Sequence, residues 1–263
     1  MRRFVSLFLL TAMLLSGSGC VLPQEEKGNG PLLPTISQNT WVEFGPGIER
    51  LIYQAATSTV PMMMLYRFAP NGFSWSLAVK PTPERIATWA ESDLSAAVVL
   101  NGVYFHEDFS PSGWLKRGGS VVGTREFDWE RSAAVTLNPT FSIGTASSSV
   151  DLRDAQDAFQ TYPFLIRHGV PAVQEDSGLI ARRTFMGLDT EGRVYVGIVP
   201  GGLLSLYTLS QALGALPIAW QDVVNLDGGP SSGLSVQGTE RTDVWNSDAP
   251  VPNVIVGQRV FAQ

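Results

Sequence analysis

The sequence has 263 residues, 44% of them hydrophobic and 16% charged, and its formal net charge at pH 7 is −6. This acidic balance excludes a nucleic-acid-binding protein, because phosphates demand a basic surface. The single cysteine allows no disulfide within the chain, so stability must come from a hydrophobic core, which a chain of this length can bury.

The first predicted element is a signal peptide over residues 1–19. Its first three residues supply positive charge, residues 4–15 form an apolar run that is too short for a membrane span, and small residues follow. Cys20 comes next and resembles the lipid-modified cysteine of bacterial lipoproteins, although Gly17 stands where a leucine-like residue is usual. We therefore expect an exported protein of the cell envelope, anchored to a membrane through a lipid on Cys20. The alternative is ordinary secretion with Cys20 unmodified.

Residues 20–35 are rich in Pro, Gly and charge, which predicts a flexible tether between the lipid and the domain. An ordered N-terminal arm is the alternative for this segment. Residues 36–263 follow as one continuous domain. No second apolar run in the chain is long enough to span a bilayer.

The domain opens with four segments whose residue types predict strands, at residues 41–44, 48–55, 62–68 and 73–79. A helix is then predicted to run to about residue 91, with Thr82 as its N-cap and Pro83 at its first position. The apolar run 96–100 predicts a buried strand that ends abruptly at Asn101-Gly102.

The second half of the chain continues the same pattern. It predicts a helix at 151–158 and strands at 132–137, 141–144 and 162–167. The clearest hairpin joins residues 184–188 to 193–199. A helix over 206–213, with Thr208 or Ser210 near its cap, precedes strands at 222–226, 234–237 and 253–261. Strands outnumber helices and hairpins outnumber βαβ units, so we expect an α+β fold: a single domain with mixed or antiparallel sheets and a few helices.

Two apolar strands run directly into Asn or Asp followed by Gly, at residues 98–102 and 223–229. A buried strand that ends in polar groups gives catalytic side chains a rigid support. For Asn101-Gly102 a simple hairpin turn is the alternative. The loop after Asp227, residues 228–233, is too long for a minimal turn, and its backbone N–H groups and two hydroxyls suit an anion.

These segments resemble the phosphodiester glycosidase family over roughly residues 78–260. The resemblance rests on NGVYF at 101–105, ARRTFMGLDTEGRVYVGIV at 181–199 and NLDGGPSS at 225–232. It implies a pocket lined by residues of all three motifs: Asn101, Gly102, Arg183, Thr184, Asn225, Asp227, Gly228, Gly229, Ser231 and Ser232. Two positions depart from the family pattern. Val103 replaces a glycine, where a positive φ would be costly, and Pro230 removes one backbone N–H from the loop.

The activity that the resemblance implies is cleavage of a sugar from a phosphate through an oxocarbenium-like transition state, which a carboxylate stabilises or attacks. Phosphate leaves as a stabilised anion. Its departure therefore requires a positive potential nearby more than it requires a second, protonated carboxyl group as a proton donor. We assign Asp227 as nucleophile, base or cation stabiliser, and Arg183 with the glycine-rich loop as the phosphate site, because guanidinium binds phosphate bidentately. Arg182 is a competing candidate, and Arg183 as a surface arginine is the alternative.

The remaining members of the expected site take supporting roles. Asn225 and Asn101 complete the catalytic set. The other residues of the three motifs bind substrate, together with Trp114, the tryptophan that we expect to stack on a sugar: Gly102, Thr184, Gly228, Gly229, Ser231 and Ser232.

Two further groups of polar residues have weaker functional interpretations. His106, Glu107 and Asp108 could add an acid, a base or a metal ligand, with a charged loop tip as the alternative, whereas His168 before Gly169 is typical of a turn. A serine hydrolase built on Ser231 or Ser232 is disfavoured because the sequence lacks the Gly-x-Ser-x-Gly motif.

No cofactor is expected. The sequence has no His/Cys cluster with zinc-ligand spacing, and its aspartates do not match an EF-hand loop. A structural calcium at Asp227 or Asp108 stays open as an alternative.

Two functions remain. The first is a glycosidase that hydrolyses a sugar-1-phosphodiester bond in envelope or extracellular glycans, such as an exopolysaccharide. The second is a non-catalytic envelope lipoprotein that binds glycans or glycan phosphates, which Val103 and Pro230 favour. The expected partners are therefore a glycan or sugar-phosphodiester substrate and, through Cys20, a membrane. The sequence predicts neither the sugar nor the oligomeric state.

Overall fold

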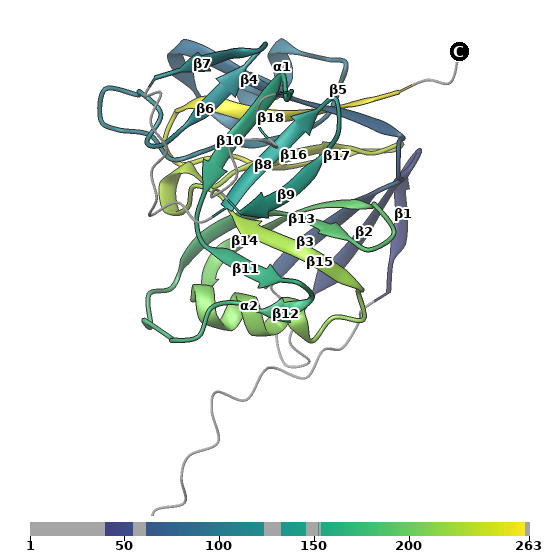
Figure 1. Cartoon of the computed structure of the whole chain (residues 1–263). Coiled ribbons are helices and arrows are strands. Elements are labelled where there is room, and N and C mark those ends of the chain that lie inside the picture. Colours follow the sequence, from purple (N-terminus) through teal and green to yellow (C-terminus); the bar gives the residue numbers. More distant parts are fainter. Residues whose placement is uncertain (1–39, 55–61, 124–132, 146–151, 153, 261–263) are drawn as a thin grey trace, which may run out of the picture. The chain divides into compact units, whose positions relative to one another are not determined.

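The computed structural model describes residues 40–54, 62–123, 133–145, 152 and 154–260. The predicted signal peptide, Cys20 and the tether lie outside these residues. Three β-sheets and two α-helices make up the described part of the chain (Figure 1). Neighbouring strands in these sheets pair antiparallel. The expected α+β class, with antiparallel sheets and few helices, is confirmed.

The largest sheet has eight strands in the order β1-β2-β3-β14-β13-β15-β11-β12. Its strands are β1 Val42–Gly45, β2 Ile48–Tyr53, β3 Met63–Phe68, β11 Phe164–Arg167, β12 Val170–Pro171, β13 Ala181–Asp189, β14 Val194–Leu204 and β15 Trp220–Asn225. At its centre lies the predicted hairpin, β13–β14. Asp189 holds the hairpin turn, because its Oδ1 accepts hydrogen bonds from the backbone N–H groups of Glu191 and Arg193 at 3.0 and 2.9 Å.

The other two sheets have five strands each. One has the order β17-β16-β5-β18-β4, with β4 Phe73–Glu84, β5 Ala96–Asn101, β16 Leu234–Gln237, β17 Thr242–Trp245 and β18 Val251–Arg259. The other has the order β7-β6-β10-β8-β9, with β6 Leu115–Arg117, β7 Ser120–Val122, β8 Ala133–Asn138, β9 Ser142–Thr145 and β10 Asp157–Thr161.

One hydrophobic cluster joins all three sheets. It contains Phe68 of the eight-stranded sheet, Leu100 of β5 and Val135 of β8, each at most 1% exposed. Because side chains alternate along a strand, the eight-stranded sheet buries a second cluster on its opposite face. There Leu165 and Val223 pack against Leu209 of helix α2, Leu206–Gly214.

Helix α1, Ile86–Ser92, begins later than the sequence predicts. The predicted start at Thr82 and Pro83 is wrong, because β4 continues through Glu84. A proline keeps the residue before it extended, and the helix receives its cap from a distant segment. Ser247 Oγ accepts from the N–H of Ile86 at 3.3 Å, and Asn246 Oδ1 accepts from the N–H of Ala87 at 3.0 Å.

The helix predicted at 151–158 is also wrong, because Asp157 belongs to strand β10 and the described residues before it are not helical. The Asp157 carboxylate accepts hydrogen bonds from the N–H groups of Leu77 at 3.0 Å and Gly118 at 2.7 Å, which fix it between neighbouring strands.

Helix α2 lies where the sequence predicts it, but its N-cap is Ser205, whose Oγ accepts from the N–H of Thr208 at 3.1 Å. Thr208 is therefore the donor to the cap and not the cap itself. Neither α1 nor α2 is long and apolar enough to cross a membrane, and the described residues contain no other α-helix.

Candidate active site

Polar residues from three separate sequence motifs meet where two sheets join. Asn101 is the last residue of β5, and Thr184 lies in the neighbouring sheet on β13. The Thr184 hydroxyl donates to Asn101 Oδ1 at 2.7 Å. Both residues are fully buried, so this hydrogen bond fixes the end of one sheet against the other.

The backbone of Asp227 rests on this pair. Its carbonyl oxygen accepts from Asn101 Nδ2 at 2.8 Å and lies 3.1 Å from Thr184 Oγ1, whose one proton it shares with Asn101 Oδ1. Its N–H donates to the carbonyl of Gly102 at 3.3 Å. Asn101 Oδ1 also accepts from the N–H of Gly233 at 3.1 Å, so both lone pairs of the carboxamide oxygen are used. Asn101 and Thr184 therefore hold the backbone of Asp227 in place.

Gly102 is required by close packing. A Cβ atom at this position would lie 2.0 Å from Asn253 Oδ1, which is far inside contact distance. The same Asn253 oxygen accepts from the N–H of Val103 at 2.7 Å. Val103 is not among the described residues with positive φ, so the strain expected from valine at this position does not arise.

Arg182 and Arg183 differ in what their guanidinium groups contact. Arg182 forms an ion pair with Asp248 at 2.8 Å and donates to the Asn246 carbonyl at 2.8 Å. Arg183 donates to the Leu179 carbonyl at 3.1 Å, and no carboxylate pairs with it in the described part of the chain. The Nε atoms of both arginines are buried without a partner. Burial lowers the pKa of Arg183, although nearby Tyr104 opposes that effect. Arg183 is thus the guanidinium that an anion could still bind.

The Arg183 side chain packs against the residue that follows Asp227. A Cβ atom on Gly228 would lie 3.4 Å from Arg183 Nη1 and 3.4 Å from the Arg182 carbonyl oxygen. Asp227 is half-buried, and its Oδ1 accepts from the Gly228 N–H at 2.8 Å. The Asp227 carboxylate and the Arg183 guanidinium, which has no carboxylate partner among the described residues, therefore both approach Gly228.

The loop that follows does not form the predicted cradle of backbone donors. Residues Gly229–Ser231 make a 3₁₀ turn, in which the N–H groups of Ser231 and Ser232 donate to the carbonyls of Gly228 and Gly229 at 3.3 and 3.1 Å. Ser231 and Ser232 are 7% and 0% exposed. Pro230 favours such a turn because its ring fixes φ. The N–H groups of Ser231 and Ser232 are therefore not free to bind an anion, and Arg183 is the charged donor beside the loop.

Asn225 is connected by hydrogen bonds to two tyrosines that were not assigned to the site from the sequence. Its Nδ2 donates to the Tyr104 hydroxyl at 2.7 Å, and that hydroxyl donates to the Tyr162 carbonyl at 2.8 Å. Asn225 is 1% exposed, and its Oδ1 is buried without a partner. Tyr104 lies within the NGVYF motif, which was the available signal for it. Nothing in the sequence pointed to Tyr162.

Other predicted positions lie outside this group. Trp114 is 7% exposed and packs among Ala134, Leu152, Ala155 and Ala158, which leaves no open ring face for a sugar. His106, Glu107 and Asp108 form an exposed loop tip, where hydrogen bonds from Ser110 lower the pKa of Asp108. His168 has a φ of 51° and lies in a turn, as predicted. The described residues contain no group of three or more His, Cys, Asp or Glu that could hold a metal ion.

Known proteins show a clear family relationship. A family model described as phosphodiester glycosidase matches residues 94–257, more than half of the chain. A solved structure from zebrafish, the catalytic domain of N-acetylglucosamine-1-phosphodiester α-N-acetylglucosaminidase auto-inhibited by its pro-peptide, is similar with a TM-score of 0.61 and 17% identity, over 82% of this chain and 85% of that one. A hypothetical protein from Synechocystis is similar with a TM-score of 0.56 and 14% identity, over 81% and 62% of the two chains. At these identities the structural likeness shows the fold. No curated protein matches the chain.

Proposed function

This chain belongs to the phosphodiester glycosidase family, and on that premise we propose that it hydrolyses the bond between a sugar and a phosphodiester. One observation carries the proposal. The charged groups of Asp227 and Arg183 both approach Gly228, and Asn101 and Thr184 hold the backbone of Asp227 in place. The substrate class that follows is a sugar-1-phosphodiester of envelope or extracellular glycans.

The proposed reaction divides the work between the two charged groups. The bond from the sugar C1 to the phosphate oxygen breaks, and its electron pair leaves with the phosphate. Water supplies the hydroxyl to C1, and the other proton of that water passes to the Asp227 carboxylate or to the solvent. The Asp227 carboxylate stabilises or attacks the oxocarbenium-like carbon, or activates the water. The Arg183 guanidinium binds the phosphate and compensates its growing charge, so the leaving group needs little protonation.

Hydrolysis of α-linked sugar phosphodiesters tests this function, beginning with N-acetylglucosamine, the sugar in the name of the zebrafish relative. We expect the protein to release free sugar and a phosphate monoester, and the Asp227→Asn variant to lose this activity. Asparagine keeps the size of the side chain but carries no charge. Undiminished hydrolysis by that variant would remove Asp227 from the mechanism.

A second candidate function is glycan binding without turnover. The observation that favours it is the loop after Asp227, where Pro230 has no N–H and those of Ser231 and Ser232 are bound within the loop. A binding protein would show saturable affinity for sugar phosphodiesters and no product over a panel of them. Efficient turnover of any member of the panel would exclude this function.

We propose that the protein is located in the cell envelope. An apolar leader, small residues and a single cysteine at position 20 support export and lipid attachment, and residues 20–35 would serve as the tether. Mass spectrometry of the mature N-terminal peptide should find a diacylglyceryl group on Cys20, and Cys20→Ser should move the protein out of the membrane fraction. An unmodified N-terminal peptide would leave ordinary secretion.

A further inference from the structure

A cavity of about 490 Å³ lies beside the candidate active site and is not used by the proposed mechanism. Apolar groups of Phe164, Val173 and Leu206 contribute to its lining. Its polar lining comes from five side chains, Tyr162, Arg167, Gln174, Glu175 and Ser177. Cavities of this size, with apolar walls and a few polar groups, are typical of sites for small-molecule ligands.

The cavity is joined to the active site through Tyr162. Tyr162 lines the cavity, and the residue is 47% exposed. Its carbonyl accepts the hydrogen bond from the Tyr104 hydroxyl, which in turn accepts from Asn225. Asn225 lies two residues before Asp227. A ligand in the cavity would therefore lie next to Tyr162, which is linked through the Tyr104 hydroxyl to Asn225 at the end of β15.

A second connection runs through the segment 172–180, of which residues 172–175 and 177 line the cavity. The segment is fixed at its start, where the Ala172 N–H donates to the Leu165 carbonyl at 2.9 Å. Near its middle, a hydrogen bond from the Ser205 hydroxyl is the main cause of a lowered pKa of Asp176. At its end the Leu179 carbonyl accepts from Arg183. The segment is thus held by hydrogen bonds within the chain, and its end contacts the proposed phosphate-binding arginine.

The chemistry of the lining suits a hydroxyl-rich ligand. Gln174, Glu175 and Ser177 offer donors and acceptors at exposed positions. The Arg167 guanidinium lies 5.2 Å from the centroid of the Phe164 ring, and its charge is opposite to that of Glu175. The exposed ring of Tyr162 offers an apolar face beside these polar groups. The two charged side chains of the lining, Arg167 and Glu175, have opposite charges, and an aromatic face lies beside them. This combination favours a saccharide over a lipid or a free anion.

We propose that this cavity is a subsite for a saccharide that continues the substrate beyond its phosphodiester bond. The inference rests on the proposed function for its place in the reaction, but saccharide binding can be measured without turnover. It predicts that the preferred substrate is a glycan of several sugars and not a phosphodiester of a small alcohol.

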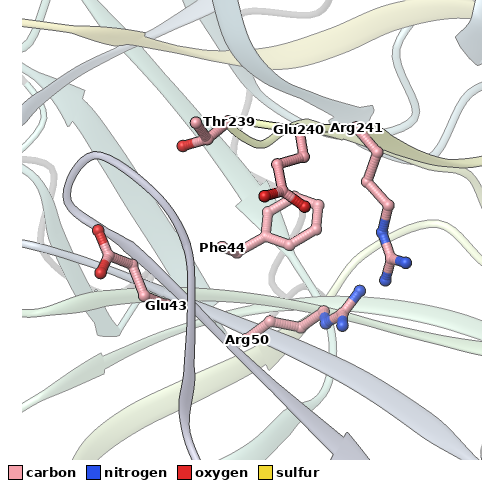
Figure 2. Close-up of a pocket in the computed structure, with 6 residues that line it drawn as sticks. All are labelled: Glu43, Phe44, Arg50, Thr239, Glu240 and Arg241. Carbon is pink, nitrogen blue, oxygen red and sulfur yellow. The ribbon is translucent and has the colours of Figure 1, made fainter.

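A second cavity, of about 480 Å³, supplies a control (Figure 2). Arg50 and Arg241 approach each other in it, and both bind Asp243, at 2.7 and 3.1 Å, so their charges are compensated. The two cavities have no lining residue in common. Arg241 is largely exposed, which makes Arg241→Ala a matched removal of one surface guanidinium away from the proposed subsite.

The kinetic experiment compares two substrates of the full-length protein. One is the methyl ester of α-N-acetylglucosamine 1-phosphate, and the other is the diester in which a maltotriose, chitotriose or mannotriose hydroxyl replaces methanol. We expect kcat/KM to be higher for at least one trisaccharide diester. Arg167→Ala should lower the ratio of the two kcat/KM values about tenfold, the effect of one lost hydrogen bond to a charged group, and Gln174→Ala should lower it about fivefold, the effect of one lost neutral hydrogen bond. Arg241→Ala should leave the ratio unchanged.

Calorimetric titration separates the subsite from the reaction. The three free trisaccharides are titrated into the wild type, Asp227→Asn and Arg167→Ala, with near-ultraviolet circular dichroism to check folding. Binding that survives Asp227→Asn and is weakened about tenfold by Arg167→Ala supports the subsite, even if no diester is hydrolysed and the proposed function fails. Equal kcat/KM for methyl and trisaccharide diesters, together with no trisaccharide binding, overturns the subsite while the proposed function stands. Absence of both binding and hydrolysis overturns both.

Discussion

At the scale of single residues, the two neighbouring arginines of β13 differ in their ion pairs. Arg182 is paired with the carboxylate of Asp248. Arg183 has no carboxylate partner in the described chain, so its charge is available to a phosphate. We predict that Arg183→Ala lowers kcat/KM for a sugar phosphodiester on the order of 10²-fold, since removal of one such donor costs about 3 kcal/mol in the transition state. Arg183→Lys should restore only part of the rate, because an ammonium lacks the bidentate fork. Steady-state kinetics measures both.

Arg182→Ala is the matched control for that prediction. Its guanidinium is bound to Asp248 and Asn246, so its loss should lower the melting temperature slightly and affect kcat/KM much less than the loss of Arg183. A partly exposed ion pair contributes about 0–1 kcal/mol. If the two variants had equal kcat/KM, the assignment of Arg183 as the phosphate-binding residue would be wrong.

The packing of Gly102 leads to a prediction about stability. A Cβ atom there would meet Asn253 Oδ1 at 2.0 Å, and Asn253 also holds Val103. Gly102→Ala should therefore lower the free energy of unfolding by about 1–3 kcal/mol, the usual cost of overpacking. Urea denaturation measures it. Gly144→Ala, on an edge strand with open space around the Cβ position, should change it far less, and equal losses in both variants would contradict the steric reason.

The residues of the site were predictable from sequence in part. The three motifs named Asn101, Thr184 and Asp227, which hydrogen bonds do bring together. The sequence could not predict which of them hold the backbone and which is accessible, because accessibility depends on burial. Asn101 and Thr184 are fully buried, whereas Asp227 is not. Tyr162 joins the site only because β11 pairs with β15, and a long-range pairing leaves no local signal in the sequence.

At the scale of elements, the β13–β14 hairpin contains a buried polar group that depends on pH. The Tyr195 hydroxyl donates to Asp189 Oδ2 at 2.8 Å, and Arg193 binds the same carboxylate at 2.7 Å. Burial first, and then this hydrogen bond, raise the pKa of Tyr195 to about 12. The unfolded chain loses the tyrosine proton near pH 10. The contribution of the proton to stability is therefore complete below about pH 10 and is lost as the pH rises towards 12.

We predict that Tyr195→Phe removes this alkaline component. The variant should be less stable by about 1–2 kcal/mol at pH 7, because Asp189 loses one donor. Between pH 10 and 12, its free energy of unfolding should fall less steeply than that of the wild type. Urea denaturation at pH 8, 10 and 11.5 measures the difference. A constant difference over this range would mean that the Tyr195 proton is not linked to folding.

The elements also show which structure a sequence predicts well. The β13–β14 hairpin was predictable because its turn is held locally, by the Asp189 side chain and the N–H groups two and four residues later. The start of α1 was not predictable, because its caps come from Asn246 and Ser247, far along the chain. The same holds for Asp157, whose helix-compatible neighbours were overridden by hydrogen bonds to Leu77 and Gly118.

At the scale of the whole domain, the shared hydrophobic cluster makes the three sheets depend on one another. Leu100 of β5 is fully buried in the cluster that also contains Phe68 of the eight-stranded sheet and Val135 of the third sheet. No sheet can lose its packing in this cluster without exposing apolar surface of the others. The described residues also belong to one compact unit. We infer that the domain unfolds as a single cooperative unit.

Leu100→Ala tests that inference. The truncation should lower the free energy of unfolding by about 2–5 kcal/mol, through lost burial and the cavity that it leaves. Tryptophan fluorescence follows side chains in different sheets, such as Trp75 and Trp220, whereas far-ultraviolet circular dichroism follows the strands. In urea the two signals should give one coincident transition in the wild type and in the variant, with the midpoint of both signals shifted together. Separate midpoints, or a shift of one signal alone, would mean that the sheets unfold independently and that the active site, which joins two of them, can open without global unfolding.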